Sequence, residues 1–278
     1  MAASVPSITL NNGIEMPQLG FGVFLVPADE VVEPVRAALD AGYRLIDTAT
    51  LYGNEDGVGR AIAESGLPRD EIFVTTKVWN SDHGYDRTLK AFDHSLKLLG
   101  LDVIDLYLIH WPTPARDLYV DTWRALERIY ADGRARAIGV SNFAVAHLDR
   151  VVGEGTVVPA VNQIELHPGF PQDELRATHA RHHIATEAWS PLGRGHGLLD
   201  RPEVTAIAAA HGRTPAQVVL RWHLQLGVVV IPKSVRAERI RENIDVFDFT
   251  LTDGEMAMLS ALDGPGRVGP DPETMNRA

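Results

Sequence analysis

The sequence predicts an α/β fold, a single (β/α)8 TIM barrel domain over residues 1–278, and three observations support this prediction. Apolar strand-like runs alternate with segments of helical period along nearly the whole chain. Several runs are apolar on both faces, which is typical of parallel strands covered by helices outside and packed inside. A polar residue also follows one run after another, and the carboxyl ends of the strands in such a barrel meet on one face, which carries the active site in barrel enzymes.

The strand-like runs can be placed in order along the chain. A hairpin comes first, over residues 8–16, with the two-residue turn signal Asn12-Gly13 at its centre. The tail from Asp263 onward is rich in Gly and Pro and is expected to be an irregular coil that either crosses the barrel mouth or hangs free. The eight strand-like runs cover residues 21–24, 43–48, 72–77, 104–110, 136–142, 159–166, 184–189 and 228–234.

The segments between these runs carry helix signals. Apolar residues at spacings of three or four precede Gly100 and Gly133, each of which can end a helix. Thr214 opens a capping box with Pro215 at the first helical position. Strand and helix therefore alternate as a barrel requires.

A doubly wound open sheet is the rival architecture, because it also alternates strands and helices. It would normally carry Gly-x-Gly-x-x-Gly after its first strand to bind a dinucleotide. The only formal match is Gly264, Gly266 and Gly269 in the tail, where no strand is expected before it and no helix after it. We therefore reject this match as a binding site and favour the barrel.

Composition excludes several classes of function. The net charge of −11 would repel nucleic acid and anionic membranes, so an anionic ligand would need a local basic cluster. No apolar run approaches the roughly 18 residues that span a bilayer, and the start of the chain does not resemble a signal peptide. The absence of Cys excludes disulfides, thiolate metal sites and a Cys nucleophile. We expect a cytoplasmic protein.

Two other kinds of active site were considered and rejected. His179, His182 and His183 cluster without carboxylate partners at ligand spacing, so no metal site is expected. Ser141 lies in Gly-Val-Ser-Asn-Phe, which lacks the second Gly of a nucleophile elbow and argues against a serine hydrolase.

Four polar residues at three consecutive strand ends form a coherent proton donor. Asp47, Lys77 and His110 close successive runs, and Tyr52 lies on the loop just after the first of them. A phenol is a poor acid at neutral pH, and an ammonium about 4 Å away favours the phenolate by roughly 4 kcal/mol before desolvation. We therefore expect Lys77 to lower the pKa of Tyr52, and Asp47 to supply the counter-charge that lets Lys77 be buried. His110 can bond a carbonyl oxygen. Considered one at a time, Asp47 could be a helix cap, Lys77 a solvated strand end and His110 a core histidine.

Six segments of the chain together resemble the aldo-keto reductases, and within them most closely the bacterial 2,5-diketogluconate reductases. The resemblance implies a barrel that uses a nicotinamide cofactor without a Rossmann domain. It assigns Tyr52 as the proton donor, tuned by Lys77 and Asp47, and His110 as the residue that orients the carbonyl. The segments are DTATLYGNE (47–55), TTKVWN (75–80), DLYLIHWP (105–112), GVSNF (139–143), NQIELHP (162–168) and IPKSVRAERIRENIDVFDF (231–249).

A cofactor track follows the later strand ends. Ser141, Asn142 and Gln163 offer hydroxyl and amide groups that can bond a nicotinamide carboxamide, and Trp189 offers a flat surface for the ring. Asn142 could instead be a helix cap, and Trp189 could simply fill the barrel. The family pattern WSPLG, in which Tyr often stands where Trp189 does, adds two residues to the cofactor site, Ser190 and Leu192.

A basic group after the last strand is the local exception that the net charge requires. Lys233, Ser234 and Arg239 can bond a ribose 2′-phosphate, which would favour NADPH over NADH by about a hundredfold or more. The alternative is a solvated basic helix start. By resemblance, Glu242 and Asn243 hold the adenine.

Four apolar residues beside these groups complete the expected site. We expect NADPH-dependent reduction of aldehydes, ketones or dicarbonyls, such as diketogluconate or methylglyoxal, to alcohols, with Tyr52 as proton donor. The alternative is a non-catalytic NADPH-binding barrel that acts as a redox sensor or structural subunit. We expect a monomer whose partner is a small carbonyl substrate. The residues that by resemblance wall the substrate pocket, and that could otherwise be ordinary core, are Phe24, Leu51, Trp79 and Trp111.

Overall fold

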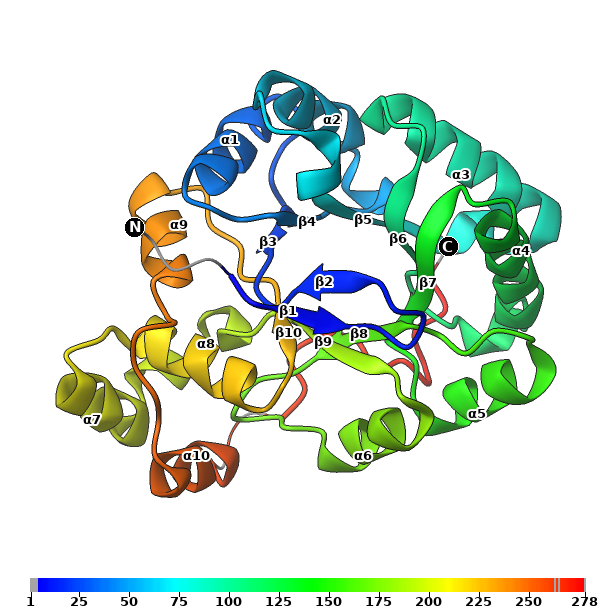
Figure 1. Cartoon of the computed structure of the whole chain (residues 1–278). Coiled ribbons are helices and arrows are strands. Elements are labelled where there is room, and N and C mark those ends of the chain that lie inside the picture. The colour runs from blue at the N-terminus through cyan, green and yellow to red at the C-terminus, as the bar shows by residue number, and fades with distance from the viewer. Residues whose placement is uncertain (1–4, 263, 265, 278) are drawn as a thin grey trace.

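Eight parallel strands form the centre of the protein and are paired in chain order (Figure 1). The computed structural model describes residues 5–262, 264 and 266–277. Each expected strand-like run overlaps one of these strands, so the predicted strand order is confirmed. The strands are β3 (Phe21–Gly22), β4 (Leu45–Asp47), β5 (Phe73–Val78), β6 (Ile104–Ile109), β7 (Ala135–Ser141), β8 (Val161–Glu165), β9 (Ala185–Trp189) and β10 (Val229–Val230).

The sheet closes on itself where the chain around β3 meets β10. The N–H of Gly20 donates to the carbonyl of Val230 at 2.9 Å, and the N–H of Val230 donates to the carbonyl of Gln18 at 3.0 Å. A further bond of 3.1 Å joins the Gly22 N–H to the carbonyl of Pro232. These bonds complete the predicted (β/α)8 barrel.

Helices surround the barrel on its outside (Figure 1). The helical patterns before Gly100 and Gly133 lie in α3 and α4, as predicted. The capping box of α8 is also present, because the Thr214 hydroxyl accepts from the Gln217 N–H at 3.3 Å and the Gln217 side chain accepts from the Thr214 N–H at 3.0 Å. The helices are α1 (Val32–Asp40), α2 (Glu55–Glu64), α3 (Tyr85–Leu99), α4 (Tyr119–Ala131), α5 (Val145–Glu154), α6 (Asp173–His182), α7 (Pro202–His211), α8 (Pro215–Gln225), α9 (Ala237–Ile244) and α10 (Asp253–Ser260). Among the described residues, no helix is long and apolar enough to cross a membrane.

Strand residues alternate between two apolar layers, which explains the runs that are apolar on both faces. In β6, Leu106 and Leu108 belong to the cluster inside the barrel. Tyr107 and Ile109 belong instead to the larger cluster between strands and helices, where Tyr107 meets Phe92 of α3 at 4.8 Å between ring centroids. Both layers exclude water, so polar residues inside the barrel must find partners there.

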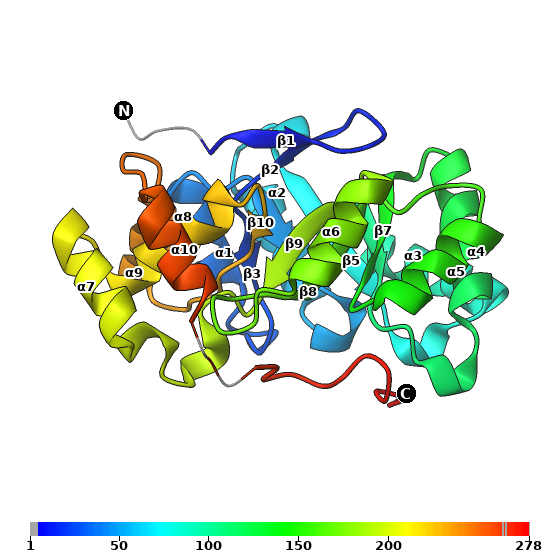
Figure 2. The same ribbon diagram turned by 90° about the horizontal axis from the view of Figure 1, so that it is seen from below.

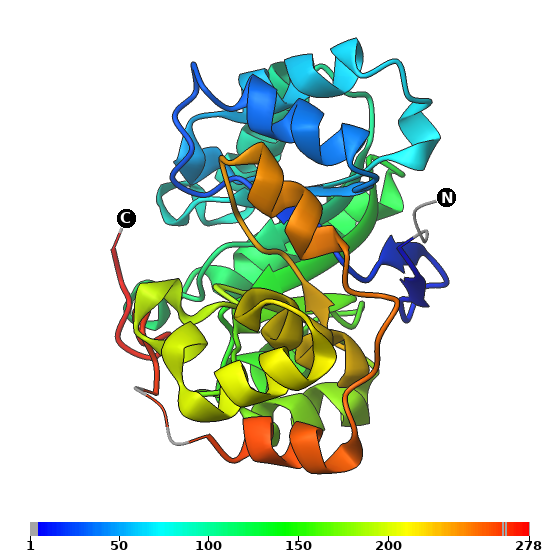
Figure 3. The same cartoon turned by 90° about the vertical axis from the view of Figure 1, so that its left-hand side faces the viewer.

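The N-terminal hairpin lies at one end of the barrel, opposite the C-terminal tail (Figures 2 and 3). It comprises β1 (Ser7–Thr9) and β2 (Glu15–Pro17), antiparallel and in register at Ile8 and Met16. The expected hairpin is confirmed, but five residues rather than two join its strands, with Gly13 at a φ of +83°. Leu10 and Met16 pack into the cluster inside the barrel. The hairpin therefore plugs this end, and the open end is left for ligands.

The C-terminal tail crosses the open end of the barrel. The Glu165 carboxylate at the end of β8 accepts from the N–H groups of Val268 and Gly269 at 2.6 and 2.9 Å. Further along, the Asn80 side chain donates to the carbonyl of Arg277 at 2.7 Å. Of the two arrangements left open by the sequence, the described part of the tail adopts the one that crosses the mouth.

The plugging role of the hairpin predicts a large stability difference between two methionine truncations. Met16 is 0% exposed, whereas Met258 on α10 is 48% exposed. Met16→Ala should lower the free energy of unfolding by about 2–5 kcal/mol because it leaves a cavity, and Met258→Ala should change it by less than about 0.5 kcal/mol. Urea denaturation of both variants measures this, and equal losses would show that the hairpin adds little to the core.

Candidate active site

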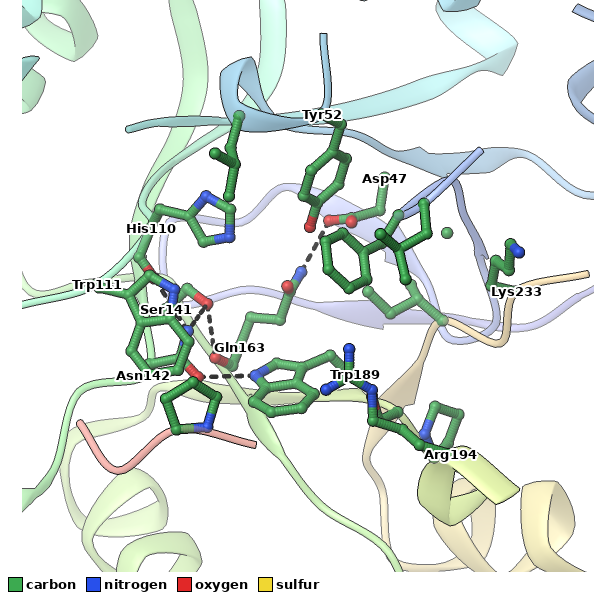
Figure 4. A pocket seen from close by; sticks show the side chains of 18 of the residues that line it. Asp47, Tyr52, His110, Trp111, Ser141, Asn142, Gln163, Trp189, Arg194 and Lys233 are labelled. Atoms are coloured by element: carbon green, nitrogen blue, oxygen red, sulfur yellow. Dashed lines mark hydrogen bonds between the residues drawn. The ribbon is translucent and has the colours of Figure 1, made fainter. Parts of the chain in front are cut away.

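A cavity of about 540 Å³ opens at the carboxyl ends of the strands (Figure 4). It gathers residues from the carboxyl-terminal parts of the barrel strands and from loops that follow them. The cavity thus brings together most of the residues that the sequence singled out. Those that border it are Phe24, Asp47, Leu51, Tyr52, Trp79, His110, Trp111, Ser141, Asn142, Gln163, Trp189, Ser190, Leu192 and Lys233.

A buried ion pair lies beneath the cavity. The Lys77 Nζ donates to the two carboxylate oxygens of Asp47 at 2.7 and 2.8 Å and to the carbonyl of Thr48 at 2.9 Å. Burial alone would lower the pKa of Lys77, but the charge and hydrogen bond of Asp47, together with Tyr52 and Glu187, outweigh it, so the pKa is raised and the ammonium is the stable form. All three ammonium protons are used in these bonds.

Tyr52 stands above this pair on a short 3₁₀ turn, Thr50–Tyr52, that follows β4. The Lys77 Nζ lies 5.2 Å from the centroid of the Tyr52 ring. Burial raises the pKa of Tyr52 to about 12, although the charge of Lys77 opposes the rise. The expectation that Lys77 would leave the phenol with a lowered pKa is therefore wrong for the protein without ligands, because desolvation of the phenolate outweighs the ammonium.

His110 follows β6 and faces the same space. Its ring meets Tyr52 at 5.7 Å and Trp79 at 5.1 Å between centroids, edge to face in both cases. Burial, reinforced by the charge of Lys77, holds the pKa of His110 well below its usual range. A neutral imidazole and a neutral phenol therefore border one cavity, and each carries a proton that a carbonyl oxygen can accept.

The amide and hydroxyl groups of the expected nicotinamide site are held by bonds within the chain. The indole N–H of Trp189 donates to the Asn142 Oδ1 at 2.8 Å, and the Asn142 Nδ2 donates to the carbonyl of His110 at 2.9 Å. The Ser141 hydroxyl donates to the Gln163 carbonyl at 2.9 Å. The Gln163 Nε2 donates to the Asp47 Oδ2 at 2.8 Å (Figure 4) and to the Glu187 Oε2 at 3.0 Å, and the Gln163 Oε1 makes no hydrogen bond to a described residue. An unused acceptor at the cavity wall fits a carboxamide N–H.

The basic group follows β10: Lys233 borders the cavity, Ser234 comes next, and Arg239 lies in α9. Lys233 and Arg239 are exposed, and neither forms a salt bridge within the described part of the chain. Ser234 is buried and its hydroxyl accepts from the Arg236 N–H at 3.1 Å. These donors suit a phosphate, so the residues present fit a phosphorylated dinucleotide.

Glu242 and Asn243, which are expected at the adenine, contact other parts of the protein. The Glu242 carboxylate accepts from the Thr214 hydroxyl at 2.7 Å, and Asn243 is buried. Together with Ser234 and Arg239, they do not border the cavity itself. All four belong to the segment that leads from Lys233 through α9.

Further residues border the cavity beside the expected catalytic, cofactor and substrate residues. Arg194 lies between Phe24 and Trp189, with its guanidinium 5.5 and 5.9 Å from their ring centroids. A positive φ is found at four non-glycine residues of the lining, which marks a strained mouth of the kind found at ligand sites. The four are Leu25, Asn142, Ser190 and Arg194. The tail contributes Pro270, Met275 and Arg277.

One histidine of the cluster considered as a metal site, His179, has a structural role. His179 is buried, with its Nε2 2.9 Å from the Asn162 side-chain nitrogen and its Nδ1 2.8 Å from the Thr186 hydroxyl. It thus joins α6 to β8 and β9.

Comparison with known proteins agrees with this geometry. An aldo-keto reductase from Mycolicibacterium smegmatis is 57% identical over 271 residues, which cover 98% of each chain. A glyoxal reductase from Bacillus subtilis is 53% identical over 270 residues, 97% of each chain. The crystal structure of a mutant of Gox0644 in complex with NADPH is 49% identical, with a TM-score of 0.94 over 98% of this chain and 99% of that one.

The sequence model described as the Aldo/keto reductase family matches residues 18–263. Together with the relatives, it establishes carbonyl reduction as the activity and NADPH/NADP⁺ as the cofactor. This chain is an NADPH-dependent oxidoreductase and belongs to the aldo/keto reductase family.

Proposed function

We propose that this enzyme reduces aldehydes, ketones or dicarbonyls to alcohols with Tyr52 as the proton donor. The observation that carries the proposal is the neutral Tyr52 phenol, which borders the cavity directly above the buried Lys77 ammonium. Because burial holds the pKa of Tyr52 near 12, the phenol keeps its proton across the physiological range. Tyr52 is therefore in its protonated form whenever a substrate binds.

The cofactor is held, in this proposal, by the residues that line the later strand ends. Gln163 accepts from the carboxamide, Ser141 and Asn142 flank it, and Trp189 stacks on the ring. When bound, NADPH supplies the hydride for the carbonyl carbon. The phosphate and adenine end is assigned to the segment after β10, with Ser190 and Leu192 between the two ends. The residues of that segment are Lys233, Ser234, Arg239, Glu242 and Asn243.

The chain's own residues carry the proton chemistry. The neutral His110 donates a hydrogen bond to the carbonyl oxygen and sets its angle. Tyr52 then transfers its proton to that oxygen as negative charge builds there. The Lys77 Nζ lies 5.2 Å from the centroid of the Tyr52 ring, and at about that separation an ammonium favours a phenolate by roughly 3 kcal/mol at an effective dielectric of about 20. Asp47 keeps the ammonium in place while this happens.

The lining of the substrate pocket suits a small carbonyl compound with apolar or flat portions. Trp79 and Trp111 stand beside His110, and Phe24 meets Tyr52 at 5.0 Å between ring centroids. Such walls exclude water from the reacting atoms. Methylglyoxal and diketogluconate are the dicarbonyls we favour, and the 53% identity to a glyoxal reductase supports this class. We further propose one domain over residues 1–278 that acts as a monomer in the cytoplasm.

The proton-donor proposal predicts that Tyr52→Phe abolishes reduction while NADPH still binds. Removing a general acid should lower kcat by about 10²–10⁴-fold, because the alkoxide then has no positioned proton. Absorbance of NADPH with methylglyoxal, diketogluconate and a nitrobenzaldehyde measures this, and NADPH fluorescence measures binding.

Tyr85→Phe is the matched control, since Tyr85 lies exposed on α3 and should leave the rate unchanged. Full activity of Tyr52→Phe would overturn the assignment. No turnover by the natural enzyme on any carbonyl, with NADPH still bound, would favour a sensor or structural subunit.

The phosphate assignment predicts a change of cofactor preference. Arg239→Ala should weaken NADPH binding about 10- to 100-fold and NADH binding far less, because only NADPH carries the 2′-phosphate. Arg241→Ala on the same helix removes an equal charge and should affect both cofactors little. Equal losses of the two cofactors in Arg239→Ala would place the 2′-phosphate elsewhere. Titration calorimetry gives all the dissociation constants.

A further inference from the structure

A second carboxyl group lies inside the barrel beside the Asp47–Lys77 pair, and the proton-donor mechanism does not use it. Glu187 on β9 is 0% exposed. It pairs in register with Gln163 on β8 and with Val229 on β10, so it faces one polar and one apolar neighbour in the sheet. Its Oε1 is buried without a hydrogen-bond partner in the described part of the chain.

Gln163 links this carboxyl group to the ion pair. Its Nε2 donates to the Glu187 Oε2 at 3.0 Å and to the Asp47 Oδ2 at 2.8 Å. Because the carboxyl oxygens of Asp47 and Glu187 both accept hydrogen bonds, the end of the Gln163 amide that faces them must be its nitrogen. The Gln163 carbonyl is then the end left for the cavity, where the proposed function places the nicotinamide carboxamide.

Within the described part of the chain, Glu187 has no cation as a hydrogen-bond partner. The three protons of Lys77 go to Asp47 and to the Thr48 carbonyl. Tyr52 and His110 also face this space, and burial keeps both of them neutral. Burial, reinforced by the charge of Asp47, raises the pKa of Glu187 to about 8. The protonated form leaves the buried cluster neutral, and the ionised form leaves it with one negative charge.

The two redox states of a nicotinamide differ by one positive charge on the ring. A ring bound at Gln163 would lie one amide group away from Glu187, whose carboxyl group is buried. A positive charge at that distance favours a carboxylate, and a neutral ring does not. The charge of Glu187 and the redox state of the cofactor are therefore linked.

We propose that Glu187 is a positioning residue that stays protonated beside NADPH and releases its proton to solvent when NADP⁺ is bound. The inference rests on the proposed place of the nicotinamide at Gln163. The proton leaves the Glu187 carboxyl O–H for the buffer, and no electrons move in this step. The released proton is additional to the one that Tyr52 gives to the substrate.

The linkage gives a measurable pH dependence of cofactor binding. Between about pH 6 and pH 9, the dissociation constant of NADP⁺ should fall relative to that of NADPH, by about tenfold for each unit by which NADP⁺ lowers the pKa of Glu187. The 2′-phosphate and its basic partners are common to both cofactors and cancel in the ratio. Calorimetry in two buffers of different ionisation enthalpy should show more proton release with NADP⁺ than with NADPH.

Glu187→Gln keeps the acceptor for Gln163 but removes the titrating group, so the ratio should become independent of pH and the extra proton release should vanish. Glu55→Gln is the matched control. Glu55 is also buried, and burial raises its pKa, but it bonds Thr76 and does not border the cavity. This control should behave like the natural protein.

The outcomes separate this inference from the proposed function. A ratio that does not change with pH in the natural protein, with both cofactors bound, would overturn the role of Glu187 and leave the proposed function standing. An unchanged pH dependence in Glu187→Gln would also overturn it. Failure of both cofactors to bind would overturn both proposals. The experiment on the natural protein decides the question even if the variant does not fold.

Discussion

The buried ion pair of Asp47 and Lys77 is the interaction on which the rest of the site depends. Neighbouring parallel strands, β4 and β5, bring the two side chains together at the carboxyl end of the barrel. An ammonium in this position is tolerable only because a carboxylate and a carbonyl take all its protons. The charges of Lys77 and Asp47 both act on the groups around them. Tyr52, His110 and Glu187 are nevertheless each held neutral by burial.

Much of this arrangement could be predicted from the sequence because strand order in a parallel barrel follows chain order. Polar residues at consecutive strand ends must then become neighbours on one face. That reasoning placed Asp47, Tyr52 and His110 at one cavity, with Lys77 beneath it.

The features that could not be predicted depend on the register of neighbouring strands, on the course of the C-terminal tail, or on a balance between burial and charge. Glu187 points into the barrel because of its register with Gln163, and the alternation of residues in a short strand does not reveal that by itself. The tail reaches the mouth through the bonds of Glu165 to residues more than 100 positions away, a pairing that leaves no local pattern. The pKa of Tyr52 is a balance of burial against the charge of Lys77, and residue types alone give only the second.

The central claim is that Tyr52 stays a neutral phenol despite the ammonium beside it. Carbon NMR of the protein labelled at the tyrosine Cζ, with the Tyr52 signal identified from Tyr52→Phe, follows its ionisation directly. Because the pKa of Tyr52 is about 12, we expect its signal to remain that of a phenol to at least about pH 10. A Tyr52 signal that moves to the phenolate position below about pH 9 would show that Lys77 outweighs burial, and would contradict this account of the site.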